Sequence, residues 1–411
     1  MQYFLGKRDN FFLVLSLIFL CSIVYSKFAL SLSMILLLLL SLLTKGEIDL
    51  KQDVKMLLGN KHLLSIGIFF LIYFISGVNS ENLGEWLHQI KMKLPYIIMP
   101  FILWRFRHLV IRYYAAFHFL FASVVFFSAI AVLFYYVYDA DNINNGISRG
   151  KAMITPVDHI KYSLFITFSI ISSLLIMWKK KLRFSKIQKV VVSIACLFLV
   201  AFLHVLASRS GIILCYILLM SMGVLFIKET KKYRMIFPLL GIIFMTPFLA
   251  YNTVPSFKSK IGYMFYDLNK YMQGEGVNYS DSERIYSYKV GYTLFRESPI
   301  LGTGIGDLMD NCKEKYKLMF HADIHKYPHN QFIFTIAGMG LLGLFLFLVA
   351  FFYPFTLFVS ERTYLFLFLT LLVLGSFTVE NTLERSYSIA FFTFFWTSGI
   401  IYSQRQSMTK A

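Results

Sequence analysis

The chain has 411 residues, of which 57% are hydrophobic and 18% aromatic, and its formal net charge is +18. Its mean hydropathy is +0.64 and most of its charges lie between long apolar stretches, which excludes a soluble globular protein. The excess of lysine and arginine lies mainly in short loops that set membrane orientation, so nucleic acid binding is the poorer explanation for the charge.

Apolar stretches long enough to cross a bilayer as helices recur along the chain. We predict about twelve, and therefore an all-α, polytopic membrane protein. They begin and end near residues 11–26, 28–43, 63–78, 94–104, 109–138, 162–178, 190–207, 212–227, 236–251, 332–359, 364–379 and 386–402. The first follows a short basic start but lacks a small-residue cleavage site, so we interpret it as a membrane anchor rather than a signal peptide.

The fourth predicted span is the weakest, because Pro95 and Pro100 interrupt it. Keeping it places about 22 basic residues on the cytoplasmic side and about 8 in the short outer loops, as the positive-inside rule requires. The predicted organisation is then nine spans in residues 1–251, an outer loop domain in 252–330, and three spans in 331–411.

The predicted outer loop is far longer than the other connections, and such loops are uncommon unless they are functional. Within it, "SDSERIYSYKVGYTLFRESP" predicts a helix that Pro299 ends. Ser280 and Glu283 match a capping box at its start. An apolar stripe expected to pack on the membrane domain consists of Ile285, Tyr288, Tyr292 and Phe295.

Two arginines on the predicted outer side are candidates for binding an anionic substrate. Arg284, in the first turn of the predicted helix, faces either a cavity or solvent. Arg209 lies in the turn "SRSG" between two spans. An arginine at such a boundary commonly extends to lipid headgroups, but its guanidinium is equally suited to bidentate phosphate binding.

The remaining polar features give weaker signals. The turn "ILGTGIGDL" lacks the strand–turn–helix context of a dinucleotide site, so its glycines predict a close approach of two backbones. Two further loops lie at span ends: one carries Arg149, Lys151 and His159, and the other carries Glu380 and Arg385. Both line either a cavity or, as we favour, a solvated rim. His118 and His204 are expected to be core residues, and the scarcity of charge within spans disfavours an ion-coupled transporter.

The four cysteines have no metal-binding or redox spacing, so neither a metal site nor a disulfide framework is expected. Three of them lie in predicted spans, and Cys312 lies alone in the predicted outer loop.

The "SRSG" turn, the helix beginning at "SER" and the later segment "HKYPHNQFIFTIAGMGLLGLFLF" together resemble the O-antigen ligase family of bacterial envelope glycosyltransferases. The similarity is strongest over residues 280–346. It implies a C-type glycosyltransferase of the bacterial inner membrane with its active site facing the periplasm. It also implies a glycan on undecaprenyl pyrophosphate as donor, a lipid A–core sugar as acceptor, and no need for a cofactor, nucleotide or metal.

The resemblance implies catalytic roles for three residues. Arg209 and Arg284 would stabilise the departing pyrophosphate, and His329 would accept the proton of the acceptor hydroxyl. Direct attack at the anomeric carbon would invert its configuration. Further candidates for binding substrate are Asn330, His325, Arg149 and His159.

Two features depart from the family pattern. Tyr286 and Tyr288 stand where the family usually has a tryptophan after the helix arginine. His321 and His325 offer alternative bases to His329. We favour His329, because a proline precedes it and the following helix fixes it at the membrane edge.

Other functions remain open. A repeat-unit polymerase or a protein O-glycosyltransferase would keep the fold and change the acceptor. A polysaccharide or lipid transporter belongs to another class. Release of undecaprenyl pyrophosphate identifies catalysis, whereas movement of a glycan without bond cleavage identifies transport.

Overall fold

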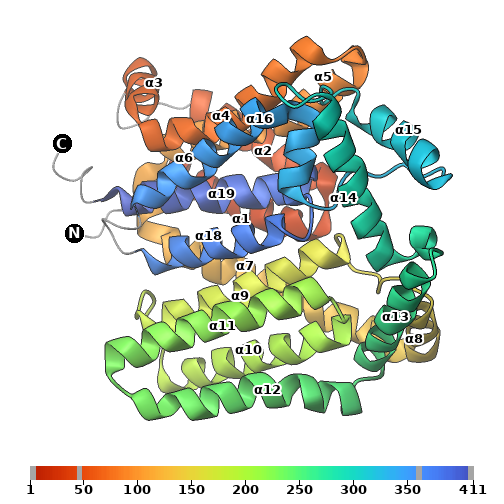
Figure 1. Ribbon diagram of the computed structural model, residues 1–411. Coiled ribbons are helices and arrows are strands. Elements are labelled where there is room, and N and C mark those ends of the chain that lie inside the picture. Colours follow the sequence, from red (N-terminus) through yellow and green to blue (C-terminus); the bar gives the residue numbers. More distant parts are fainter. Residues whose placement is uncertain (1–5, 44–48, 358–362, 406–411) are drawn as a thin grey trace. The chain divides into compact units, whose positions relative to one another are not determined.

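The computed structural model describes residues 6–43, 49–357 and 363–405, and every regular element within these ranges is a helix (Figure 1). The predicted all-α, polytopic fold is therefore confirmed. In the described ranges, eight helices are long and apolar enough to cross a membrane: Lys7–Tyr25, Lys61–Asn79, Arg107–Tyr138, His159–Trp178, Lys186–Leu206, Arg209–Thr230, Tyr233–Thr253 and Gln331–Phe355. Two shorter apolar helices accompany them, Lys27–Leu43 and Tyr364–Phe377.

The count of twelve spans stays a prediction. The fourth predicted span corresponds to α6 (Pro95–Arg105), which has 11 residues and is too short to cross a bilayer alone. Lys45 of the predicted cytoplasmic loop lies outside the described residues, as do Phe358 and Val359 at the end of the tenth predicted span.

The chain divides into two compact units. Of the residues that the structure describes, those within 1–117, 284–370 and 377–411 form unit 1, and those within 118–283 and 371–376 form unit 2. Helices α7 (Arg107–Tyr138), α14 (Ser280–Glu297) and α18 (Tyr364–Phe377) have residues in both. This division reflects contacts rather than membrane topology, so the three regions proposed from the sequence stay a prediction.

Unit 1 is built around α4 (Lys61–Ile75) and α19 (Ser386–Ser403). Its other helices are α1 (Lys7–Tyr25), α2 (Lys27–Leu43), α3 (Leu50–Gly59), η1 (Ser76–Asn79), α5 (Leu83–Lys93), α6, α15 (Leu308–Phe320), α16 (Gln331–Phe352), η4 (Tyr353–Phe355) and η5 (Thr382–Glu384). α4 packs against α16 and α6, and α19 packs against α6 and α1 (Figure 1). Phe69 of α4 contacts the rings of Tyr96, Phe347 and Phe392. Aromatic pairs of this kind stabilise the packing beyond the burial of apolar area and favour defined ring orientations.

Unit 2 is built around α9 (His159–Trp178), which is almost entirely buried between α10 (Lys186–Leu206) and α11 (Arg209–Thr230). Its other helices are α8 (Ala140–Ser148), η2 (Tyr233–Met235), α12 (Ile236–Thr253), α13 (Pro255–Met272) and η3 (Gly276–Asn278). Small residues let α9 and α11 approach closely: a Cβ on Gly211 would clash with Ser163, and Thr167 Oγ1 donates to the carbonyl of Gly211 at 3.2 Å. α13 packs against α8 (Figure 1).

Helix α16 is interrupted at Gly340, whose φ of +64° is a conformation that favours glycine. The glycine-rich turn after α14 fills the interruption. Four backbone hydrogen bonds of 2.9–3.2 Å join the two segments: Thr303 to Ala337, Gly304 to Gly338, Leu341 to Pro299 and Leu342 to Ile300. Polar backbone groups released by the break are thereby satisfied, as an apolar environment requires.

Gly302 is the closest point of this contact. Its φ is +70°, and a Cβ there would clash with the backbone of Gly338 and Met339. The predicted approach of two backbones is therefore confirmed. It fixes the C-terminal end of α14 against α16.

Candidate active site

His329 lies in unit 1, in the segment that enters α16. Gly291 of α14 makes room for this segment, because a Cβ there would lie only 2.8 Å from Pro328. The His329 backbone is fixed on both sides: its amide donates to Ser287 Oγ at 3.1 Å, and its carbonyl accepts from Tyr288 Oη at 3.1 Å. The imidazole, 23% exposed, thus projects from an immobilised backbone.

The imidazole of His329 contacts a buried carboxylate. Its Nδ1 lies 3.2 Å from Glu380 Oε1, and Glu380 is only 4% exposed. Our expectation that Glu380 belongs to a solvated rim is therefore wrong. A proton on Nδ1 satisfies this contact and leaves the lone pair on Nε2, which makes no hydrogen bond within the described residues. This arrangement suits a general base.

A buried polar network explains why the turn at residues 380–384 is drawn into unit 1. Lys93 Nζ is fully buried and donates to Glu384 Oε2 at 2.7 Å. Gln331 Nε2 donates to the same carboxylate at 3.1 Å, and the hydroxyl of Tyr73 donates to it as well. Burial lowers the pKa of Lys93, and the adjacent Glu384 opposes that shift. The network ties the turn to α4, α5 and α16.

Asn330 has a structural role at the start of α16. Its Oδ1 accepts from the amides of Phe332 and Ile333 at 2.9 and 3.0 Å, so it caps the helix. Its Nδ2 donates to the carbonyl of Thr378 at 3.0 Å. That Asn330 also binds substrate stays a prediction.

Arg284 is the fifth residue of α14 and is partly exposed. Within the described residues its guanidinium makes no hydrogen bond or ion pair. One turn later, burial raises the pKa of the Tyr288 hydroxyl, Arg284 lowers it, and Glu380 raises it. Tyr288 therefore remains a neutral donor between a cation and a carboxylate, and Arg284 is available to an anionic ligand.

The face that α14 buries differs from our prediction. Tyr286, Val290 and Leu294 are buried, whereas Ile285 and Tyr292 are 36% and 56% exposed. The buried face is the one with a glycine, which admits the entering segment of α16 more closely than the predicted aromatic stripe would allow.

In unit 2, Arg209 begins α11 and binds the carboxylate of Asp281 through both terminal nitrogens. The Nη1–Oδ2 distance is 2.6 Å, and Nη2 contacts Oδ1. The two side chains are 23% and 25% exposed. The protein itself therefore orients this guanidinium, and extension to lipid headgroups does not describe it.

Asp267 of α13 fixes the N-terminus of α14. Its fully buried carboxylate accepts from the amides of Asp281 and Ser282 at 2.7 and 3.2 Å, and from the Ser282 hydroxyl. A carboxylate is favoured there by the helix dipole. The predicted capping box of Ser280 and Glu283 is wrong, because Ser280 is already helical and its Oγ is buried without a hydrogen-bond partner in the part of the chain described.

Arg149 and His159 lie at the two ends of the connection between α8 and α9. Arg149 is exposed, and His159 is partly exposed at the start of α9. A Cβ on Gly150 would lie 2.5 Å from the hydroxyl of Tyr263, which accepts from the amide of Ser280 at 3.3 Å. α13 therefore supports both this connection and the start of α14. Substrate binding by the two residues stays a prediction.

The alternative histidines differ from His329 in their surroundings. His325 is 52% exposed, and its Nε2 lies 3.2 Å from Asp323 on the same loop. His321 ends α15 with a φ of +52°. Neither has the combination of fixed backbone and buried carboxylate that distinguishes His329.

His204 is a core residue, as predicted. It is 2% exposed, its Nδ1 lies 2.9 Å from the carbonyl of Val200, and its Nε2 lies 3.0 Å from the hydroxyl of Tyr216. Both ring nitrogens are therefore engaged within unit 2.

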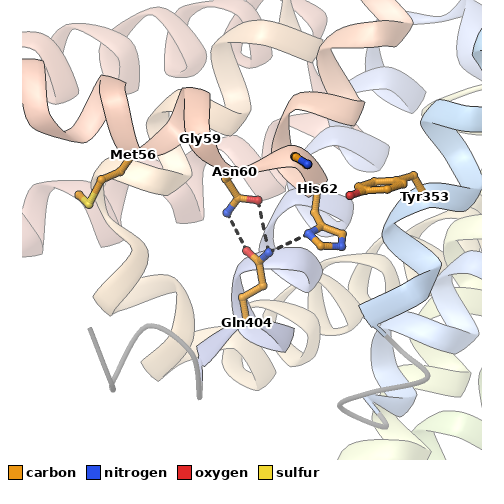
Figure 2. Close-up of a pocket in the computed structure, with 7 residues that line it drawn as sticks. Met56, Gly59, Asn60, His62, Tyr353 and Gln404 are labelled. Atoms are coloured by element: carbon orange, nitrogen blue, oxygen red, sulfur yellow. Dashed lines mark hydrogen bonds between the residues drawn. The ribbon is translucent and has the colours of Figure 1, made fainter.

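A polar hollow of about 380 Å³ lies at the start of α4 (Figure 2). Tyr73 lies near the opposite end of that helix. Its lining consists of Met56, Gly59, Asn60, Lys61, His62, Tyr353 and Gln404. The Gln404 amide bonds Asn60 at 2.8 Å and His62 Nδ1 at 3.1 Å. These groups satisfy one another, so the hollow does not present a poised acid–base pair. Among the described residues, no cluster of three or more His, Cys, Asp or Glu side chains has metal-binding geometry.

Two acidic residues of these clusters have only weak signals in the sequence. Asp281 stands three residues before Arg284 in "SDSER", but its partner Arg209 is 72 residues away. Asp267 lies in a segment for which we predicted no element. Helical periodicity over residues 255–272 would have revealed α13, but not its contact with α14.

Residues 194–348 match the family model described as O-antigen ligase. The matched segment contains Arg209, Arg284 and His329, whereas Glu380 and Lys93 lie outside it. Among curated proteins, none matches the chain. The match confirms the resemblance to the O-antigen ligase family. Together with the apolar helices, it indicates a multi-pass membrane protein with ligase- or polymerase-type glycan-transfer activity.

Proposed function

We propose that this chain, which resembles the O-antigen ligase family, transfers a glycan from undecaprenyl pyrophosphate to a hydroxyl of a lipid A–core sugar at the periplasmic face of the bacterial inner membrane. The observation that supports this most strongly is the contact of His329 with the buried carboxylate of Glu380 in unit 1. A histidine held at Nδ1 and open at Nε2 is the base that activation of a sugar hydroxyl requires.

The proposed reaction is a single displacement. The acceptor oxygen attacks the anomeric carbon while its proton passes to His329 Nε2. The bond from the anomeric carbon to the pyrophosphate oxygen breaks, and its electron pair leaves with the phosphate. Glu380 stabilises the imidazolium that results, and the glycan's anomeric configuration inverts.

We assign stabilisation of the negative charge on the leaving pyrophosphate to two arginines. Arg284 has no ion-pair partner among the described residues, so its guanidinium has its full donor capacity for phosphate oxygens. Arg209 is already oriented by a carboxylate. Oriented guanidiniums stabilise developing charge without reorganisation during the reaction.

A gel of lipopolysaccharide from complemented deletion strains tests the proposal. His329→Ala should abolish the high-molecular-weight ladder while the protein remains in the membrane. His108→Ala is the matched control and should retain the ladder, because that histidine lies on the predicted cytoplasmic side, where its Nε2 is 3.5 Å from Asp9. An unchanged ladder in His329→Ala contradicts the assignment.

The same strains report the acceptor. Single repeats accumulating on the core would identify a polymerase. Loss of glycoprotein staining with a normal ladder would identify a protein glycosyltransferase. Either outcome would keep the chemistry and replace lipid A–core as the acceptor.

A further inference from the structure

We propose that Asp281 is a positioning residue for Arg209: it holds the two terminal nitrogens of the guanidinium so that the edge bearing Nε faces the pyrophosphate of the donor. The inference rests on the proposed function in assigning Arg209 to that pyrophosphate. It adds a residue and a geometry that the O-antigen ligase match does not specify.

The geometry of the ion pair leaves one edge of the Arg209 guanidinium open. Asp281 engages Nη1 and Nη2 of Arg209, which is an end-on contact. A guanidinium has five N–H donors, and end-on pairing uses one from each terminal nitrogen. No other described side chain bonds this guanidinium. The edge formed by Nε and one terminal nitrogen therefore retains two parallel donors, the arrangement that binds phosphate bidentately.

Asp281 is itself held in place by contacts from α13. Asp281 lies in the first turn of α14, and its amide is bound by the fully buried carboxylate of Asp267 at 2.7 Å. The adjoining amide of Ser280 is bound by Tyr263 at 3.3 Å. Both anchors belong to α13, so the carboxylate that holds Arg209 projects from a fixed helix end.

The position of Arg209 makes such a holder necessary. It is the first residue of α11, where the helix dipole is unfavourable for a cation. Without Asp281, the long side chain would be free to take other rotamers. Ordering it would then reduce donor affinity.

Asp281 could also act in the opposite way, by competing with the phosphate for Arg209, and the experiment must distinguish the two roles. A carboxylate on Arg209 neutralises part of the charge that attracts phosphate. If Asp281 were a latch that the donor has to displace, its removal would tighten binding. A positioning role requires that its removal weaken binding.

The test measures binding of farnesyl pyrophosphate, a short lipid pyrophosphate, to the purified full chain in detergent by microscale thermophoresis. Asp281→Asn should raise Kd roughly 3- to 10-fold, the loss expected from freeing one long side chain. Asp281→Glu, which keeps the carboxylate, should lose less. Arg209→Ala should lose most of the affinity, and adding Asp281→Asn to it should cause no further loss.

The matched control is Glu275→Gln, since Glu275 pairs with Lys270 on the surface of unit 2 and its side chain is 62% exposed. It should bind the probe as the wild type does. Melting curves of all variants distinguish lost binding from lost folding, and Asp281→Glu keeps the test decisive if Asp281→Asn does not fold.

Unchanged or tighter binding by Asp281→Asn would overturn the inference. So would an equal loss in the Arg209→Ala background, or a wild type that does not bind the probe. A wild type that binds the probe but transfers no glycan would contradict the proposed function and leave the positioning role intact.

Discussion

His329 Nδ1 lies 3.2 Å from Glu380 Oε1, a contact between residues 51 positions apart. It joins the segment entering α16 to the turn that precedes α19. Ser287 and Tyr288 fix the backbone on one side, and the network of Lys93 and Glu384 fixes the turn on the other. An imidazole held in this way keeps one tautomer and one direction, which is what a base needs before its substrate arrives.

Glu380→Gln should lower the rate of glycan transfer on the order of 10²-fold at saturating donor, with little change in donor KM. Glutamine keeps the size of the side chain but does not stabilise an imidazolium. Glu297→Gln is the control, because Glu297 pairs with Lys315 at the surface of unit 1 and is 49% exposed. A wild-type rate in Glu380→Gln would mean that the contact does not serve catalysis.

Gly302→Ala should destabilise the protein by roughly 2–4 kcal/mol, because the new Cβ clashes with the α16 backbone at a positive φ. Gly262→Ala is the matched control. Gly262 lies inside α13 with open space around it, so alanine should be neutral or stabilise by up to about 1 kcal/mol. Thermal unfolding in detergent measures both, and equal melting temperatures would contradict the description of the α16 break.

Lys93→Met should destabilise the protein by roughly 3–5 kcal/mol, because it leaves Glu384 buried without its cation. Glu384→Gln in the same chain should recover much of that loss, since the remaining groups are then neutral. Melting temperatures of the two single variants and the double variant give the coupling. Additive losses would show that the two side chains act independently.

Cys312 should resist a membrane-impermeant maleimide at neutral pH. It is fully buried in α15, and burial raises the pKa of its thiol to about 12. Leu318→Cys, on the same helix at a position 62% exposed, should react from the periplasmic side of intact cells. Labelling of Leu318→Cys only after permeabilisation would reverse the predicted orientation. The raised pKa also means that Cys312 keeps its proton where the unfolded chain loses it, so its contribution to stability falls as pH rises above about 9.

Local features of the sequence predicted much of this molecule. Apolar runs identified the membrane helices, because backbone groups in lipid are satisfied only within helices. The glycines of "ILGTGIGDL" indicated a backbone contact, because they alone permit it. The proline and amide around His329 identified a fixed entrance to α16, although not the carboxylate that faces its ring.

Contacts between distant segments were not predictable in this way. From the sequence, Glu380 is expected in a solvated rim. It is buried because distant segments of the folded chain pack around it. Two adjacent faces of α14 carry apolar residues at helical spacing. Whether Tyr286 or Tyr288 points inward depends on which segment packs against Gly291. Asp267 replaced the expected cap because a carboxylate from a neighbouring helix binds two amides at once.

The most direct test of glycan transfer with His329 as its base uses the purified protein with a glycan on undecaprenyl pyrophosphate and lipid A–core. Chromatography with mass detection follows the released undecaprenyl pyrophosphate and the glycosylated acceptor. We expect the wild type and the control His108→Ala to form both products in equal amounts, and His329→Ala to form neither. Formation of both products by His329→Ala at the wild-type rate would contradict the account.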